Sequence, residues 1–182
     1  PDLDASGINR GYNLGDDITY SGTVSAAFEA TLMTIPAFAI SQEIGEGPSD
    51  YTAAGRWSAS LAQEILRRGM PPDPLLHVNV PRLPPKGVPV TQQGRRIYPG
   101  GVVERRDPKG RPYFWIEEGQ DLWHPHDRSD YEAVREGYVS VTPLQPDLTA
   151  HATLAAVEAL IGGTTSGRGH AKASAGMLES AG

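Results

Sequence analysis

The sequence predicts an α/β protein, with a parallel sheet and helices packed on its faces. Two short apolar runs, residues 35–41 and 75–80, are bounded by turn-forming residues, as is typical of buried parallel strands. A long amphipathic helix is expected between them, from Tyr51 to Arg68. Strands that alternate with helices along a chain favour a parallel sheet, because each helix carries the chain back to the same end.

The helix between the two strands has a clear apolar face and a clear end. Its apolar side chains recur at helical spacing, at Ala54, Trp57, Leu61 and Ile65. Two arginines occupy the last turn, where positive charge is favourable, and Gly69 follows as the residue that ends the helix.

A polar loop with regularly spaced glycines, residues 6–23, runs from an initial strand into another helix. Gly7, Gly11 and Gly15 allow positive φ and a close approach to a ligand, and the side chains between them are short and rich in oxygen. Their four-residue spacing matches neither the dinucleotide fingerprint nor the Walker loop, which would also need a lysine. The loop composition suits a hard cation or a phosphate, and a helix start favours an anion.

The second half of the chain predicts antiparallel strands that leave the core. Residues 102–105 and 113–116 are expected to pair across the turn at Asp107–Gly110. A short helix should begin at Ser129, with Glu132 three residues on, as in a capping box. A last strand is predicted at 138–142 and a last helix at 152–161. Residues 163–182 are rich in Gly, Ser and Ala and are expected to be disordered.

Bulk composition narrows the class of protein. The 182 residues suit one domain, and a net charge of -6 disfavours binding to a nucleic-acid duplex or a membrane surface. The chain has no cysteine, which excludes disulfides and thiolate metal sites and agrees with a reducing cytosol. It also has no apolar run long enough to span a bilayer. We therefore expect a soluble cytoplasmic protein.

Three separated motifs give the chain a specific resemblance. They are Ser6–Asn9 with Asn13–Asp17 and Tyr20–Val24, then Asn79–Pro81, then Gly137–Leu144 followed by Asp147–His151. In this order they resemble the SurE family of metal-dependent 5'/3'-nucleotidases. The resemblance covers roughly residues 1–160. It implies a Rossmann-like core, which we expect to span residues 1–162 with a hairpin excursion at 86–128 and a C-terminal arm at 144–162. It also implies a homodimer or homotetramer.

The resemblance assigns a metal and a phosphate site to the glycine-spaced loop. Asn9 matches a metal ligand of the family, and its amide oxygen suits Mg²⁺ or Mn²⁺. The alternative is that Asn9 only binds its own loop backbone. Ser21, Gly22 and Thr23 are expected to bind the substrate phosphate through amides and hydroxyls, unless Ser21 serves only as a helix cap. Further metal ligands, an acidic pair and a serine, are expected from a region that precedes Pro1.

Four other residues receive roles with open alternatives. Asp16 and Asp17 are assigned to substrate binding, and a purely structural role is equally compatible with the sequence. His151 is a candidate general acid, oriented by Asp147 four residues earlier. Without the resemblance, this pair would be an ordinary surface hydrogen bond. The segment His124–Asp127 looks like a solvated loop rather than a metal site.

The sequence thus predicts a metal-dependent phosphomonoesterase that hydrolyses nucleoside monophosphates. The alternative is a catalytically incomplete fragment that serves as an oligomerisation module.

Overall fold

The computed structural model describes residues 1–162, apart from residues 46, 49, 72, 83, 99 and 117–121. Residues 1–146 form one compact unit and the chain from Asp147 belongs to a second, so each is described by itself. The tail predicted to be disordered lies outside the described residues. In the part of the chain that is described, no helix combines the length and apolar character needed to cross a membrane.

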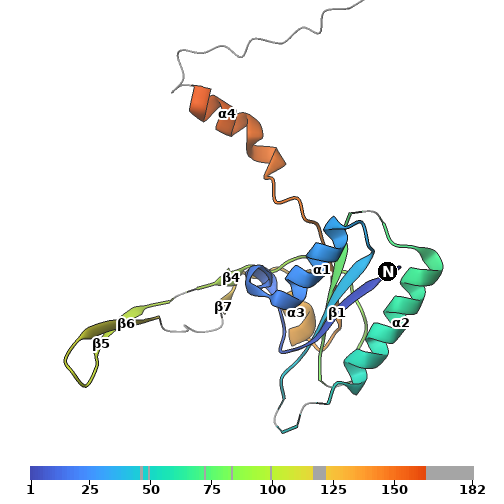
Figure 1. The fold of residues 1–182 in the computed structure, drawn as a ribbon, viewed down its shortest axis with the longest axis horizontal. Coiled ribbons are helices and arrows are strands. Elements are labelled where there is room, and N and C mark those ends of the chain that lie inside the picture. Colours follow the sequence, from blue (N-terminus) through green and yellow to red (C-terminus); the bar gives the residue numbers. More distant parts are fainter. Residues whose placement is uncertain are drawn as a thin grey trace, which may run out of the picture. The chain divides into compact units, whose positions relative to one another are not determined.

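The first unit is built on a mixed sheet of four strands in the order β1-β2-β3-β8 (Figure 1). The strands are β1 (Asp4–Arg10), β2 (Ala37–Gln42), β3 (Leu75–Val80) and β8 (Ser140–Leu144). The first three run parallel, which confirms the predicted α/β class, and β8 runs antiparallel to β3. Strand β8 therefore enters the sheet from the end at which the three parallel strands leave it.

Two helices cover opposite faces of the sheet. Helix α1 (Gly22–Leu32) buries Val24, Ala27 and Ala30 against the side chains of alternate strand residues. Helix α2 (Thr52–Arg68) buries Ala54 and Ile65 on the other face, with Trp57 and Leu61 partly buried, as the sequence predicts. Leu32, the last residue of α1, is 66% exposed.

The excursion between β3 and β8 contains the expected antiparallel pairs. Strand β4 (Arg96–Ile97) pairs with β7 (Leu122–Trp123), and β5 (Val102–Arg106) pairs with β6 (Pro112–Ile116). The carboxylate of Asp107 accepts backbone N–H groups from Lys109 and Arg111 and so stabilises the turn of the second pair. All of β6 is solvent-exposed in this chain.

Short helices connect the remaining segments. A 3₁₀ turn, η1 (Gly15–Tyr20), leads into α1, and α3 (Asp130–Arg135) precedes β8. The Ser129 side chain accepts the Glu132 N–H, which confirms the predicted cap of α3. Glu132 does not complete a capping box, because its carboxylate binds Arg135 instead. The second unit contains η2 (His151–Thr153) and α4 (Leu154–Gly162).

Candidate functional site

Polar side chains form a row across the carboxyl end of the parallel strands. Asn9 of β1 is in register with Ser41 of β2, Ser41 with Asn79 of β3, and Asn79 with Ser140 of β8. Asn9 is part-buried and the other three are fully buried. The apolar residues at alternate positions of these strands pack under α1, so the row lies on the α1 face. In open parallel sheets, the carboxyl ends of the strands are where ligands bind.

Hydrogen bonds join the glycine-spaced loop to this row of residues. The Asn13 N–H donates to Asn79 Oδ1 at 3.0 Å, and Asn79 Nδ2 donates to the Asn13 carbonyl at 3.0 Å. The Asn13 side chain donates to Ser41 Oγ at 2.6 Å. The loop is therefore held at one residue by three hydrogen bonds from two neighbouring strands.

Asn9 and the start of α1 are joined by one hydrogen bond. The Thr23 hydroxyl donates to Asn9 Oδ1 over a long 3.3 Å, while Asn9 Nδ2 donates to the Gly11 carbonyl at 2.9 Å. Ser21 caps the helix by accepting the Val24 N–H. The backbone N–H groups of Gly22 and Thr23 belong to the first turn, where a helix offers no acceptor of its own. This arrangement can present two amides and a hydroxyl to an anion beside Asn9.

Asp16 and Asp17 are bound to the excursion. Asp16 Oδ2 accepts the backbone N–H of Arg96, and Asp17 forms an ion pair with the Arg96 guanidinium at 2.7 Å. Tyr98 donates its hydroxyl to Asp17 at 2.7 Å, and this hydrogen bond raises the pKa of Tyr98 to about 12. Both carboxylates have structural partners here, and their assignment to substrate stays a prediction.

The pair Asp147 and His151 lies in the second unit. His151 Nε2 is 2.7 Å from Asp147 Oδ2, and both side chains are more than half exposed. Hydrogen bonds from Thr149 and then His151 hold the pKa of Asp147 below its usual value. The pairing is as the sequence predicts, and its catalytic role stays a prediction.

The first unit also contains two buried titratable groups, His77 and Asp130. Burial lowers the pKa of His77, two residues before Asn79 on the same strand, to about 4. His77 Nε2 is 3.5 Å from Asn79 Nδ2, and Nδ1 is buried without a hydrogen-bond partner. Burial raises the pKa of Asp130, against the opposing effect of backbone N–H groups donated by Gly15, Gly94 and Tyr131.

The residues described here provide part of a metal site at most. Asn9 contributes one amide oxygen of the type that Mg²⁺ and Mn²⁺ bind, and its present hydrogen bond to Thr23 is long. Within the described ranges, no group of three or more His, Cys, Asp or Glu side chains is arranged to hold a metal ion. These residues therefore do not fit a complete divalent-cation site.

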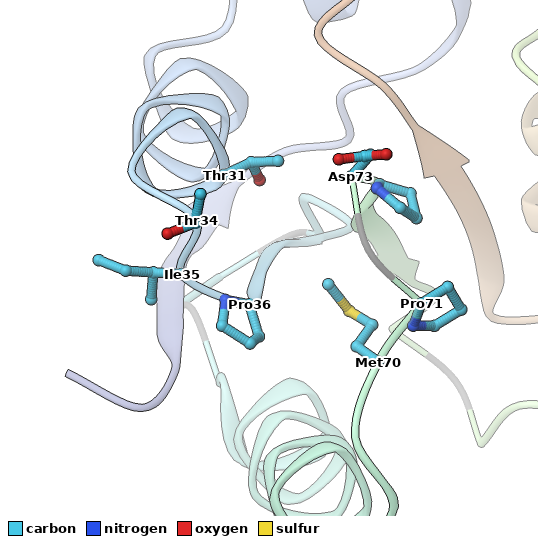
Figure 2. Close-up of a pocket in the computed structure, with 8 residues that line it drawn as sticks. Thr31, Thr34, Ile35, Pro36, Met70, Pro71 and Asp73 are labelled. Carbon is cyan, nitrogen blue, oxygen red and sulfur yellow. The ribbon is translucent and has the colours of Figure 1, made fainter.

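A cavity of about 310 Å³ lies elsewhere in the first unit (Figure 2). Its lining residues come from the end of α1 and the segments that enter β2 and β3, so it lies at the amino ends of the strands: Thr31, Thr34, Ile35, Pro36, Met70, Pro71, Asp73 and Pro74. None of the site residues predicted from the sequence lines it.

Several residues of the site were not assigned a role from the sequence. Asn79 and Ser140 fall within the motifs that carry the resemblance, and Ser41, His77 and Asp130 were not singled out. Their common signal is a polar side chain inside an otherwise apolar strand, or a carboxylate at a helix start. Such residues end up buried, and buried polar groups require partners.

Comparison with known proteins finds similar chains. A family model described as "Survival protein SurE" matches residues 1–100. The chain is 50% identical over 161 residues to "5'-nucleotidase SurE" of Geobacter sulfurreducens, covering 87% of this chain and 62% of that protein. It is 46% identical over 171 residues to "5'-nucleotidase SurE 1" of Thermus thermophilus, covering 90% and 64%.

A solved structure shares the fold. The crystal structure of the Sure protein from Aquifex aeolicus superimposes with a TM-score of 0.77 at 42% identity, covering 88% of this chain and 65% of that one. The chain thus spans less than two thirds of the length of these relatives.

Proposed function

Because the chain belongs to the SurE family, we propose that it is part of a metal-dependent phosphomonoesterase acting on nucleoside 5'- and 3'-monophosphates. The observation that carries this proposal is the meeting of Asn9 with the start of α1 at the carboxyl end of the parallel strands. The relatives named above are 5'-nucleotidases, which supports the same activity here.

The start of α1 would bind the phosphoryl group. The amides of Gly22 and Thr23 lie in the first turn, and the helix dipole adds positive potential there. Because these donors are fixed by the helix, they can stabilise negative charge on the phosphoryl oxygens without reorganising. The long hydrogen bond between Thr23 and Asn9 would exchange for contacts with the ligand.

We assign Asn9 as this chain's own metal ligand, with Mg²⁺ or Mn²⁺ as the cation. Asn9 supplies one ligand atom, and these ions bind several more. Carboxylates from outside the described residues would therefore have to complete the site. Residues 1–182 alone should therefore bind Mn²⁺ only weakly. Isothermal titration of this segment, after circular dichroism has shown that it is folded, tests the assignment, and tight Mn²⁺ binding would contradict it.

We also propose roles for the four residues that the geometry leaves open. His151, oriented by Asp147 at 2.7 Å, would protonate the leaving alkoxide. Asp16 and Asp17 would border the nucleoside from η1 while they remain bound to Arg96. We further propose a cytoplasmic protein that forms a homodimer or homotetramer.

Hydrolysis assays with the protein in its full natural length test the proposal. AMP and p-nitrophenyl phosphate should be hydrolysed in the presence of Mn²⁺. Replacing Asn9 by Ala should lower kcat/KM by at least about 10-fold, as is typical when a metal site is disturbed. Thr23→Ala should also lower it, whereas Ser25→Ala should not, because the Ser25 hydroxyl binds only the Ser21 carbonyl. A wild-type protein without hydrolysis would overturn the proposal.

A further inference from the structure

We propose that Asn79, oriented by a neutral His77, is a positioning residue that fixes the glycine-spaced loop and so places Asn9 against Thr23. This inference rests on the proposed function for its catalytic consequence, and its structural part stands by itself. Neither residue was given a role from the sequence.

The Asn79 amide pairs with the backbone of Asn13 in both directions. Its oxygen accepts the Asn13 N–H and its nitrogen donates to the Asn13 carbonyl, each at 3.0 Å. Asn79 is completely buried. A rotation of the amide by half a turn would oppose two donors and two acceptors, so the two-point pair fixes its orientation.

The nitrogen of the same amide also faces the His77 ring, at the limit of hydrogen-bond distance. Asn79 Nδ2 lies 3.5 Å from His77 Nε2, so the contact is favourable only when that nitrogen accepts, and the ring proton then lies on Nδ1, which is buried without a hydrogen-bond partner. A charged imidazole would carry a proton on Nε2 as well, so this N–H donor would face the N–H donor of the Asn79 amide and the contact would become unfavourable. Burial favours the neutral ring that this requires.

The loop transmits the position of Asn79 to Asn9. Asn9 Nδ2 is bound to the carbonyl of Gly11, two residues before the clamped Asn13. Its Oδ1 is left to face Thr23. If Asn13 were released from Asn79, the segment that holds the Asn9 amide would become mobile. Asn9 Oδ1 would then no longer be held in one position beside the start of α1.

Kinetics of Asn79→Leu in the full-length protein test the catalytic consequence. Leucine conserves the shape of the asparagine side chain but cannot pair with Asn13. We expect kcat to fall by about 100-fold, because a small misplacement of reacting groups has an effect of that size. The KM for AMP should change little. The matched control is Thr142→Val, which removes the buried hydrogen bond to Thr91 on the same sheet face at 2.7 Å without touching the loop. Equal losses in both variants would mean that only stability is involved.

The His77 variants separate orientation from packing. His77→Gln places an oxygen where Nε2 lies and should retain most of the kcat, whereas His77→Leu should lose it as Asn79→Leu does. In the wild-type protein, ¹⁵N NMR should show the tautomer with the proton on Nδ1. A proton on Nε2 would overturn the role given to His77.

A readout independent of hydrolysis keeps the two proposals distinguishable. In a crystal structure of Asn79→Leu, Asn9 Oδ1 should be displaced from Thr23. In hydrogen-exchange measurements in solution, the Asn13 amide should exchange faster in Asn79→Leu than in Thr142→Val. If Asn9 stays in place, the positioning role is wrong even when the wild-type protein is an active phosphatase. If Asn9 moves but the wild-type protein hydrolyses nothing, it is the proposed function that fails.

Discussion

Single buried polar residues determine how the stability of the fold depends on pH. His77 is fully buried, and its pKa in the folded chain is about 4, against 6.5 for an exposed histidine. Between these values the unfolded chain binds a proton that the folded chain does not. The free energy of unfolding must therefore fall as the pH falls through this window.

The first prediction is that His77→Gln removes this contribution. Wild-type protein should lose roughly 3 kcal/mol of stability through His77 between about pH 6.5 and pH 4, since one pKa unit corresponds to about 1.4 kcal/mol. Urea unfolding of both proteins at several pH values shows how the free energy of unfolding of each depends on pH. The contribution of Asp130 is the same in both proteins, so it cancels in the difference between them. Parallel curves for the two proteins would show that His77 titrates normally.

The second prediction concerns Asp130, which joins separate segments at one carboxylate. Its oxygens accept N–H groups from Gly15 and Gly94, the residues that begin η1 and precede β4. Asp130→Ala would leave both donors buried without a partner, at a cost of about 1–3 kcal/mol for each. We expect a loss of roughly 3 kcal/mol in chemical denaturation. The exposed Asp127→Ala serves as the control and should change stability by less than about 0.5 kcal/mol.

The contacts of these residues explain which site features the sequence could predict. Asn9 lies in the glycine-spaced loop and Thr23 at a helix start. Both features can be predicted from neighbouring residues in the sequence. Asn79 pairs with Asn13, which is 66 residues away, and Asp130 binds Gly15 over 115 residues. Spacing along the chain contains no signal for partners that only the tertiary structure brings together.

At the scale of elements, periodicity predicted the helices and strands that bury a full apolar face. Strand β3 has the predicted bounds, and α2 begins one residue after the predicted start. The last strand lies two residues later than expected, at Ser140–Leu144, because Tyr138 and Val139 bind backbone groups of Ala133 and Gly87 instead of β3. Backbone hydrogen bonds to remote segments shift a boundary that side-chain patterns alone cannot locate.

The third prediction compares two glycines of α2. Gly69 ends the helix at φ 78°, a region that residues with a side chain rarely adopt, while Gly55 lies inside the helix. A Cβ atom would meet no neighbour at either position. Gly69→Ala should therefore destabilise the protein by about 1–3 kcal/mol through backbone strain alone. Gly55→Ala should stabilise it by about 0.5–1 kcal/mol through helix propensity. Thermal unfolding of both variants gives the two signs, and a shift in the same direction for both would contradict the argument.

At the scale of the whole molecule, the excursion is not needed to build the core but exposes much apolar surface. Strand β6 presents Phe114, Trp115 and Ile116, each more than 60% exposed, whereas the two core clusters contain none of these residues. Soluble proteins rarely leave such a strand uncovered, and contiguous apolar patches commonly mark interfaces. Composition could predict the strand.

The last prediction is that β6 mediates the proposed self-association. Alternate residues of a strand face opposite sides, so Phe114→Ser with Ile116→Ser changes one face and Tyr113→Ser with Trp115→Ser changes the other. If the strand is covered by a second copy of the chain, at least one double variant should shift the mass measured by light scattering toward the monomer. Thermal stability of the isolated chain should change little, because these side chains are exposed within it. Lys109→Ser at the turn of the same hairpin is the control, and an unchanged oligomer in both double variants would show that β6 is not the interface.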